Sequence, residues 1–127
     1  MAEKTFTIQV PVKCDTEAIY DILWSAFNSG STYWLGEITT LGNCIGSTYM
    51  SHLIGGGTLI ISVPVDDNDE EFEKHTLTLE KFLKGLELYF ANGFEGISNG
   101  RVDTGSIDAS MSDIVLQYSL FNDIVFG

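Results

Sequence analysis

Apolar and polar residues alternate along residues 5–12, the first segment of the chain with a clear pattern. A period of two is typical of a β-strand that buries one face. Pro11 cannot donate a hydrogen bond to a neighbouring strand, so we expect this strand at the edge of a sheet. The apolar positions of the segment are Phe6, Ile8, Val10 and Val12.

Three later segments repeat apolar residues every three or four positions. This spacing predicts amphipathic helices at about 16–27, 79–90 and 109–121. The residues that can cap their first turns are Asp15 or Thr16, Thr78 and Asp108. Asn and Gly residues follow the first two segments and are typical of helix ends. The third segment is apolar around most of its circumference, so we expect it to be buried.

The remaining apolar runs predict strands. Residues 58–65 are β-branched and apolar, as in the most buried strand of a sheet. We interpret residues 31–52, where glycines interrupt the apolar positions, as two short strands. The order of elements predicts an α+β fold: one domain over residues 1–127, with a small, mainly antiparallel sheet covered by about three helices.

The charge of the chain limits its partners. The 127 residues include six Lys and Arg and eighteen Asp and Glu, which gives a formal net charge of −12. Such a field repels phosphate backbones, so we expect no direct binding of nucleic acid. The first residues lack the apolar block of a signal peptide, and no run approaches the length of a membrane span. We therefore expect a soluble, cytoplasmic protein that does not bind membranes.

Six of the acids lie within residues 66–73. They are Asp66, Asp67, Asp69, Glu70, Glu71 and Glu73. Glycine and glutamate are missing at the spacing that an EF-hand requires, so this motif does not predict a calcium site. Two interpretations stay open: a solvated loop that keeps the domain soluble, and a surface that attracts a groove rich in Arg and Lys and imitates a phosphate backbone.

No motif for catalysis, metal or cofactor binding stands out. Gly55-Gly56-Gly57 lacks the Lys and Ser/Thr of a phosphate-binding loop. His52 and His75 lie in unrelated segments, and Cys14 and Cys44 have neither a paired cysteine nor a neighbouring base. We therefore expect no metal, no cofactor and no enzymatic activity, and we interpret the cysteines as reduced core residues.

Ser31, Tyr33 and Trp34 follow the expected end of the first helix. Tyr33 and Trp34 can cap the core. The alternative is a ligand or interface patch, because tyrosine and tryptophan are enriched at binding hot spots and stack on bases.

Several short motifs are familiar in combination. They are residues 26–34 (AFNSGSTYW), 57–60 (GTLI), 83–86 (LKGL), 112–117 (SDIVLQ) and 120–127 (LFNDIVFG). Together they resemble a family of small proteins of bacteriophages and other mobile elements. The resemblance implies a genomic setting and no reaction, because no catalytic signature of the family can be transferred to residues of this chain. Residues 66–73 look like an elaboration of the family pattern.

Three hypotheses follow. In the first, the chain is a phage-encoded inhibitor of a bacterial defence system, of the anti-CRISPR type, whose acids meet the basic channel of a host defence protein such as an RNA-guided nuclease, in the cytoplasm of the infected cell. In the second, it binds a small molecule, such as a nucleotide signal, through Tyr33 and Trp34. In the third, it is a structural phage protein that forms a homodimer or larger oligomer through a sheet edge.

Overall fold

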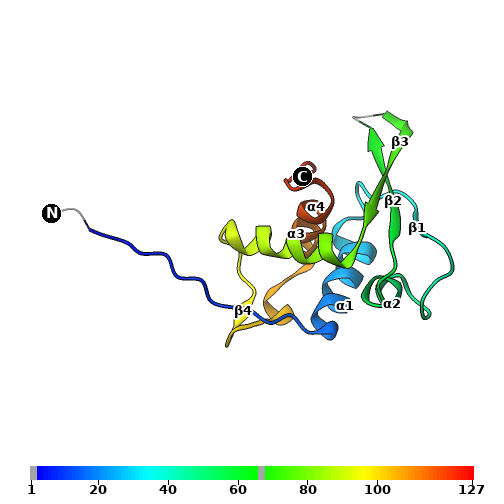
Figure 1. The fold of residues 1–127 in the computed structure, drawn as a ribbon. Helices are drawn as coiled ribbons and strands as arrows, with labels where there is room; N and C mark the ends of the chain where they lie inside the picture. Colours follow the sequence, from blue (N-terminus) through cyan, green and yellow to red (C-terminus); the bar gives the residue numbers. More distant parts are fainter. Residues whose placement is uncertain (1–2, 66–67) are drawn as a thin grey trace.

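The computed structural model describes residues 3–65 and 68–127, and of residues 68 and 69 it describes the backbone. These residues form an α+β domain in which helices pack against a small antiparallel sheet (Figure 1). The helices are α1 (Thr16–Ser25), α2 (Tyr49–Ile54), α3 (Leu79–Ala91) and α4 (Ala109–Phe121), with a π-helical turn η1 (Ala26–Gly30) after α1 and a 3-10 turn η2 (Thr104–Ser106). The expected fold class is confirmed.

The main sheet has the order β1-β2-β3, with both pairs antiparallel. Its strands are β1 (Ile38–Thr40), β2 (Leu59–Val65) and β3 (Asn68–Leu77), and a separate two-stranded ladder joins β4 (Ile97–Ser98) to β5 (Arg101–Val102). Strand β2 is central and buries Leu59, Ile61 and Val63 on one face. The prediction that residues 58–65 form the most buried strand is confirmed.

The predicted caps lie where the helices begin. The side chains of Asp15, Thr78 and Asp108 accept hydrogen bonds from backbone N–H groups in the first turns of α1, α3 and α4. Helix α4 ends at Asn122, which has a left-handed backbone with φ of 58°. The three long helices therefore begin where the sequence predicts; α3 and α4 end within one residue of the expected bounds, and α1 gives way to η1 after Ser25.

Helices α3 and α4 pack at very close range. A Cβ atom at Gly85 of α3 would overlap the backbone and Oγ of Ser119 on α4. The core between the helices and the sheet is apolar and contains fully buried side chains from each layer, among them Leu23, Leu53, Leu59, Phe82, Tyr89 and Val115. As expected, α4 is buried around most of its circumference.

Three expectations are wrong. Residues 3–12 pair with no strand and run outward from the body in an extended form (Figure 1). Residues 31–52 form one short strand, β1, and the short helix α2, because Thr48 and Ser51 form a capping box instead of continuing a strand. The acidic segment from residue 68 onward belongs to β3, whose pairing with β2 continues through Glu73 and Phe72.

No helix within the described residues combines the length and apolar character needed to cross a bilayer.

Candidate functional site

The β2–β3 hairpin extends beyond the helices at one end of the molecule (Figure 1). The register runs regularly from Leu59 opposite Leu77 to Pro64 opposite Phe72, and then shifts before Val65 pairs with Asn68. A bulge of this kind twists a hairpin and is typical of sheet edges. Strand β3 pairs only with β2 among the described strands, so its outer edge is open.

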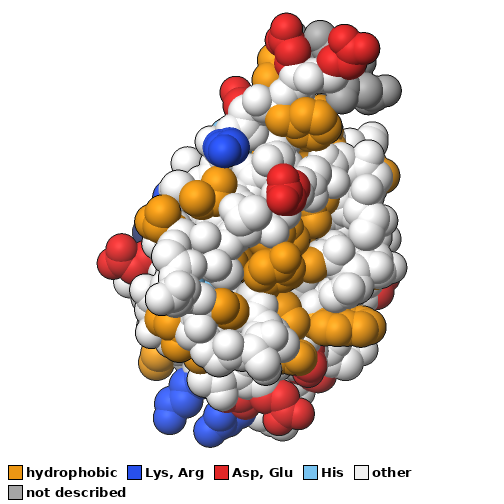
Figure 2. Space-filling model, turned by 90° about the vertical axis from the view of Figure 1, so that its right-hand side faces the viewer, with side chains coloured by type: hydrophobic (Ala, Val, Ile, Leu, Met, Phe, Trp, Pro, Cys, Tyr) orange, Lys and Arg blue, Asp and Glu red, His pale blue; other side chains and the backbone are white. Residues whose placement is uncertain are grey.

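Acidic side chains gather at the far end of this hairpin. Glu70, Glu71 and Glu73 are exposed on β3, and Figure 2 shows Asp and Glu side chains at its tip with hydrophobic side chains spread over the face below. Asp66 and Asp67 lie outside the described residues, as does the side chain of Asp69. The described residues contain no group of three metal-ligating side chains.

The base of the hairpin is fixed to the body. His75 Nε2 lies 2.8 Å from Glu73 Oε1, and the His75 ring meets the edge of Phe121 from α4 at 5.1 Å between ring centres. These contacts tie the strand that carries the acids to a buried helix. The hairpin is therefore anchored to the body at Glu73 and His75, while Glu70 and Glu71 lie beyond this anchor, where the register shifts.

A cleft of about 580 Å³ separates the hairpin from the C-terminal segment. Glu73 is the one charged residue among its described lining, and apolar side chains form its walls: Val63, Pro64, Val65, Phe121, Val125 and Phe126. Lysine and arginine have apolar stems and charged heads, so a cleft with apolar walls and one carboxylate suits either side chain.

The structure brings Ser31, Tyr33 and Trp34 together around one carboxylate, that of Asp113 on α4. Ser31 Oγ and Trp34 Nε1 donate to Asp113 Oδ1 at 2.8 and 2.7 Å, and Tyr33 OH donates to Oδ2 at 2.7 Å. Gln117 Nε2 donates to the same Oδ2 at 3.1 Å. Burial, followed by the hydrogen bond and charge of Asp113, raises the pKa of Tyr33 to about 12.

The same cluster holds the end of the chain against the core. Gln117 Oε1 accepts hydrogen bonds from the backbone N–H groups of Val125 and Phe126, both at 2.8 Å. The Phe126 ring stacks on Trp34 at 5.0 Å. Trp34 is only 4% exposed. Its burial supports the core interpretation and leaves no open ring face for stacking on a base, although Tyr33 remains exposed.

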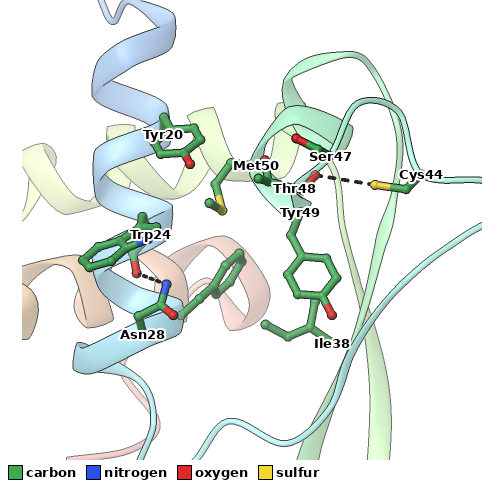
Figure 3. A pocket seen from close by; sticks show the side chains of 10 residues that line it. Tyr20, Trp24, Asn28, Ile38, Cys44, Ser47, Thr48, Tyr49 and Met50 are labelled. Atoms are coloured by element: carbon green, nitrogen blue, oxygen red, sulfur yellow. Dashed lines mark hydrogen bonds between the residues drawn. The ribbon is translucent and has the colours of Figure 1, made fainter.

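A groove of about 510 Å³ lies between α1 and the segment that leads into α2 (Figure 3). Four at least partly exposed aromatic residues line it: Tyr20 and Trp24 from α1, Phe27 from η1 and Tyr49 from α2. No charged side chain is among its described lining residues. The sequence contains a signal for this groove, because Tyr20 and Trp24 are four positions apart on the polar side of the expected helix.

The histidine and cysteine side chains considered for chemistry have structural surroundings. His52 is buried, with Nδ1 accepting from Ile45 N–H at 2.9 Å and Nε2 lying 3.0 Å from the carbonyl of Thr58, so both ring nitrogens are engaged. Burial and the charge of Asp15 raise the pKa of Cys14 to about 11, which disfavours the reactive thiolate. Cys44 is exposed, with its thiol 3.6 Å from the Thr48 carbonyl, so the interpretation of Cys44 as a core residue is wrong.

No protein-family model matches the chain, and neither a curated protein nor a solved structure matches it. The resemblance to phage proteins therefore stays a prediction, and the functional argument rests on the residues themselves.

Proposed function

We propose that this chain is an inhibitor that acts by binding: the acidic β2–β3 hairpin occupies a basic, nucleic-acid-binding groove of a partner protein. The observation that carries the proposal is the display of Glu70, Glu71 and Glu73 on a hairpin that projects from the body. A loop that only keeps the domain soluble would not require a projecting pair of strands. In the setting that the family resemblance implies, the partner is a bacterial defence protein such as an RNA-guided nuclease, met in the cytoplasm of the infected cell.

The charge and the shape of the hairpin both favour this partner. A net charge of −12 accelerates encounter with a basic groove and makes association sensitive to salt. The cleft at the base of the hairpin accepts an arginine or lysine stem between Pro64 and Phe126 and presents Glu73 to the cation. The proposed interface therefore combines steering at the tip with a specific contact at the base.

The test compares two variants that lose the same charge. The first carries Glu70→Gln, Glu71→Gln and Glu73→Gln on the hairpin, and the control carries Glu17→Gln, Glu87→Gln and Glu95→Gln elsewhere on the surface. Proteins captured from bacterial lysate at low salt identify the partner. Displacement of nucleic acid from that purified partner is then measured with each variant.

We expect the hairpin variant to bind the partner at least about tenfold more weakly, since three interface charges each contribute up to about 1 kcal/mol. The control should displace nucleic acid like the natural sequence. An equal loss of displacement in both variants would mean that only the net charge matters, which would overturn the hairpin as the binding surface. Unchanged displacement by the hairpin variant would also overturn the proposal.

The aromatic groove supports a second candidate function, the binding of a small uncharged molecule with an aromatic ring. Its lining offers stacking faces and no cation, so a phosphate-bearing nucleotide would find no counter-charge there. Mass spectrometry of molecules released on heating tests this function. A released ligand that Trp24→Ala loses and Trp34→Phe keeps would support the groove over the Tyr33 and Trp34 patch.

A further inference from the structure

The segment of residues 3–12, here called the arm, exposes apolar side chains at alternate positions. Phe6, Ile8 and Val10 are 86, 80 and 65% exposed, and Val12 is 40% exposed. No backbone hydrogen bond joins residues 3–12 to another described residue. A strand with one apolar face and unpaired backbone groups is a template for pairing with another chain.

Lys13, the residue that follows the arm, pairs with a strand of its own domain, but this pairing does not continue into the arm. Lys13 N–H donates to Gly100 O, and Val102 N–H donates to Lys13 O, both at 2.9 Å, in a parallel bridge to β5. Before Lys13 the arm would have to continue beside residues that precede Arg101, but the chain reverses there in the turn at Asn99 and Gly100. The arm therefore passes the end of the only strand that could pair with it in this part of the described fold.

The residues where the arm joins the body favour an extended backbone. Proline fixes φ of Pro11 near −65° and restricts Val10 before it to extended conformations. Val12 is β-branched and unsuited to a tight turn. A ten-residue extended segment reaches about 33 Å, which is near the diameter of a small domain. The arm is thus held extended, and its apolar side chains stay exposed.

A matching acceptor lies where the arm leaves the body. A groove of about 170 Å³ runs between α3 and β5, and Leu83, Leu86, Phe90 and Val102 line it together with Val12 and Cys14. Leu83 is 39% exposed. The arm and the groove adjoin at Val12, so a two-fold axis near this residue would place each arm beside the groove of the other copy.

The continuity of arm and groove favours a second copy of this chain as the occupant, because one two-fold contact would cover both apolar surfaces of each copy. The arm, residues 3–12, contains Glu3 and Lys4 and has no net charge, so the rest of the chain carries the whole −12. Glu87 stands at the edge of the groove. The neutral arm can therefore reach the acidic surface of another copy without the repulsion that two bodies in direct contact would meet.

We propose that the chain forms a two-fold symmetric homodimer by reciprocal exchange of its arms, in which the Phe6, Ile8 and Val10 face of one arm covers the groove at Leu83 and Phe90 of the other copy. This inference is independent of the proposed inhibitor function. It concerns the opposite end of the molecule from the β2–β3 hairpin (Figure 1).

The experiment uses the full chain and two arm variants with the same added charge. Phe6→Lys with Ile8→Lys changes the apolar face, and Thr5→Lys with Thr7→Lys changes the polar face. Because the arm contributes nothing to the core, all three proteins should fold, which circular dichroism checks. Light scattering after gel filtration, from micromolar to near-millimolar concentration, measures the mass.

We expect twice the 14.0 kDa chain mass for the natural sequence and for the polar-face variant, and a single chain mass for the apolar-face variant. A single chain mass for the natural sequence at every concentration would overturn the proposal and leave the arm to a different protein. So would an apolar-face variant that stays dimeric, or equal dissociation of both variants.

A second pair of variants tests the acceptor. Leu83→Glu places a charge in the groove, and Lys84→Glu places one at the next, outward position of α3. We expect Leu83→Glu to reduce the mass to one chain and Lys84→Glu to remain dimeric. A dimeric Leu83→Glu protein would overturn the groove as the acceptor.

Discussion

At Asp113 a single carboxylate organises side chains from distant parts of the sequence. Three of its four partners, Ser31, Tyr33 and Trp34, stand 79 to 82 positions earlier in the chain. The sequence indicates that these residues follow a helix end and that an acid interrupts the apolar positions of the last helix. The sequence does not indicate that these side chains meet Asp113, because their distance in space depends on how α4 packs against η1. The residues of the candidate ligand patch thus share one hydrogen-bonded cluster around Asp113.

Asp113→Asn should destabilise the fold. The amide of asparagine would place an N–H group against donors, since Tyr33 OH and Gln117 Nε2 both donate to one carboxylate oxygen. We expect a loss of about 3 kcal/mol in the free energy of unfolding, as for a buried charged acceptor that loses its role. Denaturant unfolding measures it, with Glu87→Gln as the exposed control. A loss below about 1 kcal/mol would contradict the structural role of the cluster.

Two tyrosines should make stability depend on alkaline pH. Burial raises the pKa of Tyr33 and of Tyr89 from 10.0 to about 12, aided in Tyr33 by Asp113 and in Tyr89 by the charges of Asp108 and Glu95. The folded state holds these protons more tightly than the unfolded state, so the contribution is complete below pH 10 and is lost as the pH rises towards 12. Denaturant unfolding across this range should show the decline, and Tyr89→Phe should reduce it. An unchanged slope in the variant would contradict the assignment.

At the scale of elements, the three long helices and the buried strand β2 were predictable, and the other strands were not. Helices α1, α3 and α4 have local signals, a 3.6-residue period and a capping side chain, that do not depend on the rest of the fold. A strand depends on a partner: residues 5–12 have the pattern but no partner, and residues 68–73 lack the pattern but pair with β2. The short helix α2 was missed because its signal is a capping box at Thr48 and Ser51 without a long apolar repeat.

The contact between α3 and α4 predicts the sign of the change in stability on Gly85→Ala. Alanine normally stabilises a helix interior by up to about 1 kcal/mol relative to glycine. At Gly85 the new methyl group would overlap Ser119, so we expect Gly85→Ala to destabilise the protein by about 2 kcal/mol instead. Lys84→Ala, on the exposed side of the same helix, is the control in thermal unfolding. A stabilised Gly85→Ala protein would show that the helices can separate at no cost.

At the scale of the whole molecule, the two proposed surfaces point in different directions. The arm leaves the body on one side, and the β2–β3 hairpin leaves it at the other end (Figure 1). A dimer formed through the arms would therefore keep both hairpins accessible. If the partner presents its basic grooves in pairs or in multiple copies, such a dimer binds with an effective concentration that a monomer lacks.

This arrangement predicts that dimer formation and displacement of nucleic acid can each be lost without the other. The Phe6→Lys and Ile8→Lys protein should be monomeric and still displace nucleic acid from the partner, with a weaker apparent affinity only where the partner is multivalent. The hairpin variant with Glu70, Glu71 and Glu73 changed to glutamine should lose displacement and keep its dimeric mass. Light scattering and the displacement assay on the same four proteins, the natural chain, both variants and their combination, decide the matter. Loss of both properties in either single variant would mean that the arm and the hairpin belong to one interface, because surfaces at opposite ends of a rigid core should fail independently.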